Sequence, residues 1–156
     1  MSFNRLTWGV KASFRSYVEA AGGAVTLSEG ATRAADGTFI FQALPGGDLI
    51  IAADGHATGS VRFQGTVTFD AHGGMLNATL AELGLEIGSE GLVLTARAAP
   101  LNQERCAIAD LSVLDVGPNN GINLAARITL DGMYQIADNY PPGTELDPLQ
   151  LDYAAG

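Results

Sequence analysis

Apart from the carboxylates, few side chains of this sequence stand out by type or spacing as candidates for metal binding or catalysis. They are two histidines, His56 and His72, one cysteine, Cys106, and a serine and a tyrosine four residues apart, Ser13 and Tyr17. Imidazole and thiolate groups bind metals, and imidazole and phenol groups exchange protons in acid–base catalysis. Four residues is close to one helical turn, so the serine and the tyrosine would share one face of a helix.

No common catalytic motif accompanies these side chains. The sequence has no Walker loop, GxSxG or HExxH motif, and its glycine pairs lack the strand–GxGxxG–helix context of a dinucleotide site. His56 and His72 with a carboxylate would supply three zinc ligands, but their spacing fits no helix or turn pattern. Cys106 alone forms neither an internal disulfide nor a thiolate metal site. We therefore expect a binding protein and not an enzyme.

Helical periodicity is clear once, over residues 8–21, where Thr7 could serve as the N-cap and two glycines follow the last turn. Apolar residues at three- and four-residue spacing form one stripe of this segment: Trp8, Phe14, Tyr17, Val18 and Ala21. A stripe this broad must be covered. We expect the helix to pack across one end or edge of a larger structure.

The rest of the chain alternates with the period of two that is typical of strands. The expected strands cover residues 38–42, 58–69, 76–80, 85–87, 92–98, 107–116, 122–130 and 146–153. Glycine-rich turns are expected at residues 72–74, 88–91 and 117–121. Many strands joined by short turns, without βαβ alternation, predict a mainly β fold. We expect an antiparallel two-sheet sandwich or open barrel with one N-terminal α-helix, as a single domain over residues 1–156.

Composition excludes several classes of protein. With 156 residues, 47% hydrophobic and 16% charged, the chain is not disordered. The net charge of −9 and the lack of a basic stripe argue against nucleic acid and anionic membranes as partners. No apolar run is long enough to span a membrane. Residues 1–8 contain no signal-peptide core, which leaves a cytoplasmic protein and a trimmed mature domain both open.

Three separated segments resemble the HtaA domain of actinobacterial haem-uptake proteins. They are residues 8–18 (WGVKASFRSYV), 65–76 (GTVTFDAHGGML) and 140–148 (YPPGTELDP), with shorter agreement at residues 30–32 and 36–39. The resemblance spans nearly the whole chain in the right order. It implies a two-sheet β fold with a short helix that binds ferric haem b for haem capture and transfer, with a haem-donor or haem-acceptor protein as a further partner. It also implies an exported or cell-surface location.

By motif position, the resemblance implies that Tyr17 is the axial iron ligand and that His72 hydrogen-bonds it. Ser13, one turn before the tyrosine, would contact a haem propionate. The residues suit these roles. Phenolate is a hard anionic donor for Fe(III), and a bound cation favours phenolate although a free tyrosine has a pKa near ~10. An imidazole N–H would orient and stabilise that anion. Phe14, Phe63 and Phe69 are candidate apolar walls.

The propionates also favour a cation, and Lys11 and Arg15 are near in sequence. Two other interpretations of the sequence stay open. In one, a carrier or enzyme with the same fold uses the apolar pocket for another small hydrophobic molecule, with Tyr17 and His72 as an acid–base pair. In the other, the domain is structural and binds no ligand.

Overall fold

The structure is a computed structural model, which describes residues 3–52, 54–71, 73, 76–89, 91–99, 102–116, 121–136 and 140–153. In chain order its elements are β1 (Phe3–Trp8), α1 (Ala12–Ala20), β2 (Ala24–Ser28), β3 (Thr32–Arg33), β4 (Phe39–Gln42), β5 (Ile50–Ile51), β6 (Ala57–Thr58), β7 (Val61–Arg62), β8 (Thr66–Ala71), β9 (Leu76–Ala81), β10 (Gly84–Gly88), β11 (Gly91–Ala99), β12 (Asn102–Val116), β13 (Ile122–Ile128), α2 (Leu130–Gln135) and β14 (Glu145–Tyr153). The prediction of a mainly β fold with a helix near the N-terminus is confirmed.

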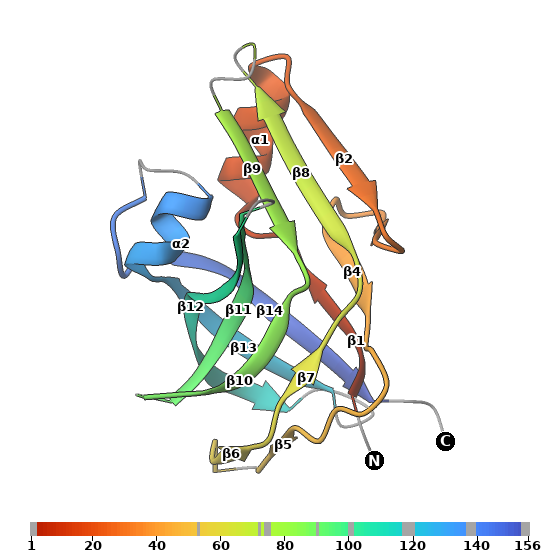
Figure 1. Cartoon of the computed structure of the whole chain (residues 1–156), viewed down its shortest axis with the longest axis vertical. Helices are drawn as coiled ribbons and strands as arrows, with labels where there is room; N and C mark the ends of the chain where they lie inside the picture. Colours follow the sequence, from red (N-terminus) through yellow and green to blue (C-terminus); the bar gives the residue numbers. More distant parts are fainter. Residues whose placement is uncertain are drawn as a thin grey trace.

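The main body is one antiparallel sheet in the order β3-β4-β1-β14-β13-β12-β11-β10-β7. It curls into a half-barrel (Figure 1). From β10 to β14 neighbouring strands of the sheet are consecutive in sequence, and the connection from β13 to β14 contains α2. The N-terminal strand β1 lies between β4 and β14, so the first and last strands of the chain are adjacent.

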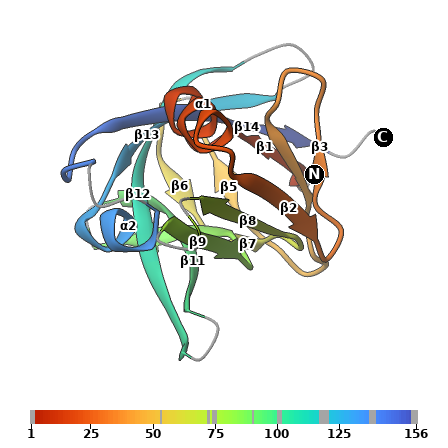
Figure 2. The same ribbon diagram turned by 90° about the horizontal axis from the view of Figure 1, so that it is seen from above.

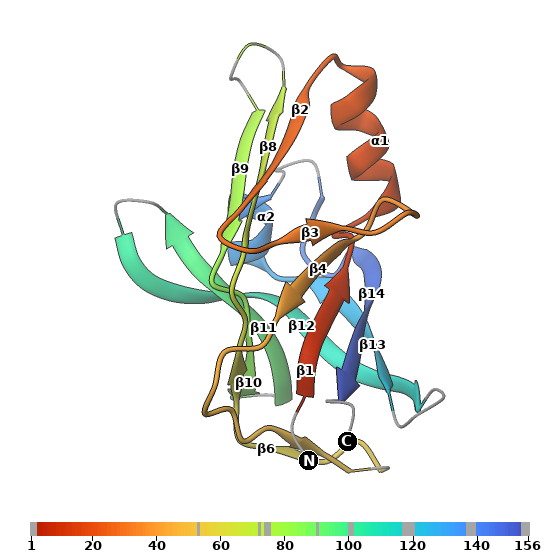
Figure 3. The same ribbon diagram turned by 90° about the vertical axis from the view of Figure 1, so that its right-hand side faces the viewer.

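A three-stranded sheet, β2-β8-β9, rises from the half-barrel and supports α1. Figure 3 shows α1 beside this sheet at the upper end of the molecule. Helix α1 contacts β2 and β8, and α2 contacts β9 and β12. The adjacent strands β8 and β9 therefore link the two helices (Figure 2). The hairpin of β5 and β6 lies at the opposite end from α1 (Figure 1).

The strand expected over residues 58–69 covers the end of β6, all of β7 and most of β8, which belong to three different sheets. The chain leaves the large sheet after Phe63, which forms a single bridge to Ala43. Gly65 then has a positive φ of 123°. A Cβ on Gly65 would lie 2.8 Å from the Phe41 ring, so glycine is required both for the backbone angle and for the close approach. Period-two alternation does not reveal such a break.

The helix begins at Ala12, not at Trp8, and its N-cap is Lys11 and not Thr7. Trp8 instead ends β1, a strand that the sequence analysis did not predict. Leu6 and Trp8 are buried on the same face of β1. Pairing with β4 on one side and β14 on the other fixes these residues as a strand, so tertiary contacts override the helical periodicity at Trp8.

The strand expected over residues 122–130 ends at Ile128, and the short helix α2 follows. Thr129 is its N-cap, and the Thr129 hydroxyl accepts a hydrogen bond of 3.0 Å from the Gly132 N–H. A Cβ on Gly132 would overlap the carbonyl oxygen of Ile108, so glycine lets α2 pack closely against β12. Of the turns expected at residues 72–74 and 117–121, only Gly73 and Gly121 lie in the described ranges.

Large apolar side chains fill the space between the half-barrel, the three-stranded sheet and α1. The largest of them with less than 2% exposure are Trp8, Phe14, Phe39, Phe41, Phe63 and Phe69. Phe69 lies between two of these rings, with its centroid 4.9 Å from that of Phe14 and 5.7 Å from that of Phe39, both edge to face. The described part of the chain holds no helix long and apolar enough to cross a membrane.

Candidate functional site

Helix α1 presents a serine and a tyrosine on an exposed face. Phe14 and Val18 anchor the helix, with 1% and 0% exposure. Ser13 is exposed, and Tyr17, one turn further on, is 48% exposed. The buried side of α1 thus fixes the helix while both hydroxyl-bearing side chains stay accessible. The shared face is what the four-residue spacing predicts. The expectation that Tyr17 belongs to the covered apolar stripe is wrong, because Phe14 and Val18 are the residues of α1 that face the core.

A second tyrosine joins this site from the far end of the chain. The hydroxyl oxygen of Tyr140 lies 3.5 Å from Oγ of Ser13. Its ring packs edge to face on Phe14, with centroids 6.2 Å apart and planes at 65°. Sequence analysis gave Tyr140 no role at the site. The YPPGT segment was the feature of the sequence that could have pointed to Tyr140. Spacing along the chain could not, because residues 13 and 140 lie far apart in sequence.

The segment that carries Tyr140 is held by hydrogen bonds to the end of β13. Ile128 donates its N–H to the Thr144 carbonyl at 2.9 Å and accepts at its own carbonyl from the Gly143 N–H at 2.8 Å. The Thr144 hydroxyl donates to the Pro141 carbonyl at 2.6 Å, closing the turn on itself. Tyr140 is therefore fixed by the large sheet, whereas Ser13 is fixed by α1.

His72 lies outside the described residues, so its predicted hydrogen bond to Tyr17 is not tested by the structure. Strand β8 ends at Ala71. A Cβ on Gly23, just beyond α1, would lie 2.8 Å from the Ala71 Cβ, so the end of β8 lies beside the C-terminal end of the helix. The proximity of Tyr17 and His72 stays a prediction.

The aromatic residues expected as ligand walls are interior residues in this structure. Phe63 and Phe69 are both 0% exposed, and Phe14 is 1% exposed. Phe14 and Phe69 contact each other beneath the exposed face of α1. We therefore assign these rings to the core that supports the site. Their contact with a ligand stays a prediction.

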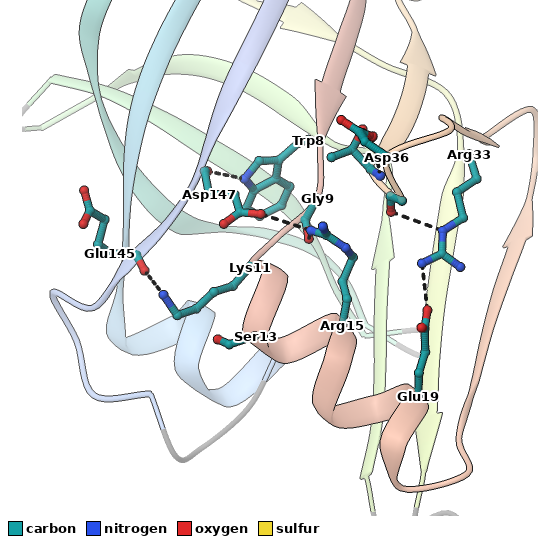
Figure 4. A network of polar contacts seen from close by, with 12 residues as sticks. Trp8, Gly9, Lys11, Ser13, Arg15, Glu19, Arg33, Asp36, Glu145 and Asp147 are labelled. Carbon is teal, nitrogen blue, oxygen red and sulfur yellow. Dashed lines mark hydrogen bonds and ion pairs between the residues drawn. The ribbon is translucent and has the colours of Figure 1, made fainter.

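The cations next to Ser13 in the sequence are bonded to the body of the domain (Figure 4). Lys11 Nζ donates to the Glu145 carbonyl at 2.9 Å. Arg15 Nη1 donates to the Gly9 carbonyl at 2.7 Å and to the Asp147 carboxylate at 3.0 Å. In Figure 4, Arg15 and Ser13 point away from α1 in different directions. Sequence analysis missed this role of Arg15, because Gly9 follows the end of β1 and Asp147 lies on β14, far away in sequence.

The other candidate residues lie elsewhere. His56 is exposed at the β5–β6 hairpin, and its backbone N–H donates to the Asp54 carboxylate at 2.9 Å. Cys106 on β12 is a free, half-buried cysteine, and burial raises the pKa of its thiol, with a further contribution from Asp131. Within the described ranges, no three His, Cys, Asp or Glu side chains gather as a metal-ion site. The hydroxyl-bearing face of α1 is therefore the strongest candidate site.

The fold and this face of α1 define a class of protein: a curled antiparallel β domain whose N-terminal helix displays a serine and a tyrosine beside the chain's closing segment. The chain belongs to the HtaA family, whose model, described as Htaa, matches residues 4–152. A comparison with curated protein sequences gave no significant match.

Solved structures of similar fold come from Corynebacterium glutamicum. The C-terminal domain of HtaA is 27% identical, with a TM-score of 0.73 over 96% of this chain and 97% of that one. The N-terminal domain of HtaA is 24% identical, with a TM-score of 0.72 over 99% and 98%. The heme-binding protein HtaB is 16% identical, with a TM-score of 0.69 over 96% and 91%. The last two likenesses show the fold alone.

Proposed function

We propose that this domain binds ferric haem b at the exposed face of α1 and passes it on, with Tyr17 as the axial ligand of the iron. The observation that carries the proposal is the position of Tyr17: a half-exposed phenol on a helix that is anchored by a fully buried face, in a chain of the HtaA family. HtaB, which shares the fold, is a heme-binding protein.

The residues present fit such a ligand. Tyr17 supplies a hard oxygen donor of the kind that ferric iron accepts. The Ser13 and Tyr140 hydroxyls, 3.5 Å apart, supply two donors that together suit one carboxylate, and haem carries two propionates. The ring of Tyr140 adds a half-buried aromatic surface next to them.

In this proposal His72 donates a hydrogen bond to the Tyr17 oxygen, which orients the phenol and stabilises its anionic form. The support for His72 is its place in the HGG segment that follows β8. Haem is the cargo of this site, and the domain needs no reacting group of its own. A haem-donor or haem-acceptor protein is then the expected partner.

A haemin titration followed by visible absorption tests the proposal. We expect the wild-type protein to bind haemin at one site and to show a phenolate-to-iron charge-transfer band. Tyr17→Phe keeps the ring and removes the oxygen donor, so this variant loses the band and nearly all of the affinity. Absence of haemin binding by the wild type, or an unchanged band in Tyr17→Phe, would contradict the proposal.

The same titration separates the alternatives. If the pocket serves another small hydrophobic molecule, haemin gives no tyrosinate spectrum, and an apolar fluorescent probe binds in its place. A purely structural domain binds neither haemin nor the probe. Either result overturns the proposal.

A further inference from the structure

The turn between β1 and α1 contains a strained residue. Val10 has a φ of 65° and is 1% exposed. Positive φ is rare for any residue other than glycine, and for a buried β-branched side chain it is a genuine outlier. Such a conformation persists only where surrounding contacts hold it. The backbone that sets the direction of α1 is therefore fixed by contacts from outside the turn.

Those contacts converge on one residue of β14, Asp147. Its N–H donates to the Val10 carbonyl at 2.8 Å, and its carbonyl accepts from Trp8 Nε1 at 2.8 Å. Its carboxylate accepts from Arg15 Nη1 at 3.0 Å, and the same nitrogen donates to the Gly9 carbonyl at 2.7 Å. Asp147 thus binds the last residue of β1, the strained turn and the first turns of α1 (Figure 4).

In the Arg15–Asp147 ion pair, the arginine is better shielded from water than the arginines of the other pairs on α1 and on β1. The Arg15 side chain is 13% exposed and that of Asp147 is 29% exposed. The Arg33–Glu19 pair at the far end of α1 is 34% and 53% exposed, and the Arg5–Asp152 pair between β1 and β14 is 47% and 21% exposed. Exposed ion pairs contribute little, whereas breaking a shielded pair leaves a charge poorly solvated.

We infer that Arg15 and Asp147 form a positioning pair, which sets the direction of α1 and thereby holds Ser13 and Tyr17 in place for the ligand. This inference rests on the proposed function. Arg15 lies between Ser13 and Tyr17 in sequence and projects toward β14, so loss of its contacts frees the N-terminal end of the helix. The Ser13–Tyr140 distance of 3.5 Å is already at the outer limit of a hydrogen bond, so a small tilt of α1 separates the two hydroxyls.

Gly9 shows how closely Arg15 fits. A Cβ on Gly9 would overlap Nη1 of Arg15 and would lie 3.0 Å from the methyl group of Thr38. Both neighbours are side chains, and the long arginine side chain is the one that can move aside. Gly9→Ala therefore displaces the guanidinium without removing it. This gives a second, chemically independent way to break the same contact.

The test compares Arg15→Met, Asp147→Ala, the double variant and Gly9→Ala with a matched control, Arg5→Met. The control removes an arginine–aspartate pair that joins β1 to β14 away from the turn, whereas Arg15 joins α1 to β14. Amide hydrogen exchange of the unliganded protein reports on α1 directly, and haemin titration reports on the site. Thermal unfolding confirms that each variant is folded. If Arg15→Met does not fold, Arg15→Lys replaces it in the comparison. Lysine keeps the positive charge but lacks the planar guanidinium group.

We expect the three single variants at the turn to speed exchange of the α1 amides. We also expect them to weaken haemin binding about 10- to 100-fold, as is typical for loss of groups that orient a ligand. The double variant should lose little more haemin affinity than Arg15→Met alone. Arg5→Met should match the wild type in both α1 amide exchange and haemin affinity. Unchanged α1 exchange in folded Arg15→Met overturns the inference even if haemin binds. Failure of the wild type to bind haemin overturns the proposed function, while the exchange experiment still decides the role of the pair.

Discussion

The hydroxyl groups of Ser13 and Tyr140 lie 3.5 Å apart, although 127 positions separate the two residues in the chain. One is carried by the first helix and the other by the segment that leads into the last strand. Phe14 links the same two segments from below, through its contact with the Tyr140 ring. The candidate site is thus assembled from both ends of the chain, which the adjacency of β1 and β14 brings together.

Removing either hydroxyl of this pair should weaken haemin binding modestly. Ser13→Ala and Tyr140→Phe each delete one hydrogen-bonding group and keep the packing, at a cost of about 0.5–1.5 kcal/mol, or roughly a 2- to 10-fold loss of affinity. Because both groups serve one carboxylate, the double variant should lose less than the sum. Tyr134→Phe is the matched control, since Tyr134 is 70% exposed and lies on α2 and not on α1. Equal losses in the control and in Tyr140→Phe would refute the assignment.

Among the remaining candidates the effects on haemin affinity should follow a fixed order. Tyr17→Ala removes the iron ligand and nearly abolishes binding, while α1 survives because alanine is the best helix former. His72→Ala should cost about 10- to 100-fold, as expected for a group that orients a metal ligand. Ser13→Ala should cost less, and His56→Ala, on the distant hairpin, should be neutral. Titrations of the four folded variants give the order. His56→Ala as the most damaging variant would place the site elsewhere.

Local pattern predicted those parts of the site that lie on one element. The spacing of Ser13 and Tyr17 placed them correctly on one face of a helix, because side chains four apart share a face in any helix. The alternation along β4, β9 and β13 predicted those strands for a similar reason. Tyr140 and Asp147 could not be assigned from spacing, because their roles depend on which strands become neighbours.

The errors at the start of α1 have the same origin. Trp8 fits a helical stripe and an alternating strand equally well, and only its pairing partners in β4 and β14 decide between them. The same pairing produces the strained turn at Val10, since the chain must change direction within three residues to enter α1. The period-two alternation also continues across Gly65, where the chain passes from one sheet to another. The sequence pattern does not show this break, because it depends on the close packing of Phe41 against Gly65.

Truncation of Phe69 should destabilise the fold strongly. The ring is 0% exposed and touches both Phe14 and Phe39, so Phe69→Ala leaves a cavity under α1 at a cost of about 3–5 kcal/mol. Ile50→Ala is the control, because Ile50 is 62% exposed and its loss should stay within about 0.5 kcal/mol. Urea unfolding measures both. A loss below about 1 kcal/mol for Phe69→Ala would show that the ring is not a central core residue.

Cys106 should react slowly with alkylating reagents near neutral pH. Burial raises the pKa of its thiol, and Asp131 raises it further, so the reactive thiolate is scarce in the folded protein. Because the folded pKa exceeds the unfolded one, the associated stability is fully present below the unfolded pKa. It is lost as the pH rises through the folded value. Iodoacetamide labelling from pH 7 to 10, with the urea-unfolded chain as reference, checks this. Faster labelling of the folded protein would contradict it.

Reduction of the iron should weaken haem binding and speed its release. An anionic phenolate offsets part of the charge of ferric iron, and that stabilisation falls when the iron becomes ferrous. The expected result is faster transfer of haem to apomyoglobin after dithionite is added than before it. His56→Ala, which keeps the phenolate and is expected to bind haemin normally, is the matched control and should respond to reduction as the wild type does. Equal or slower transfer from the reduced wild type would show that the oxygen of Tyr17 does not hold the iron.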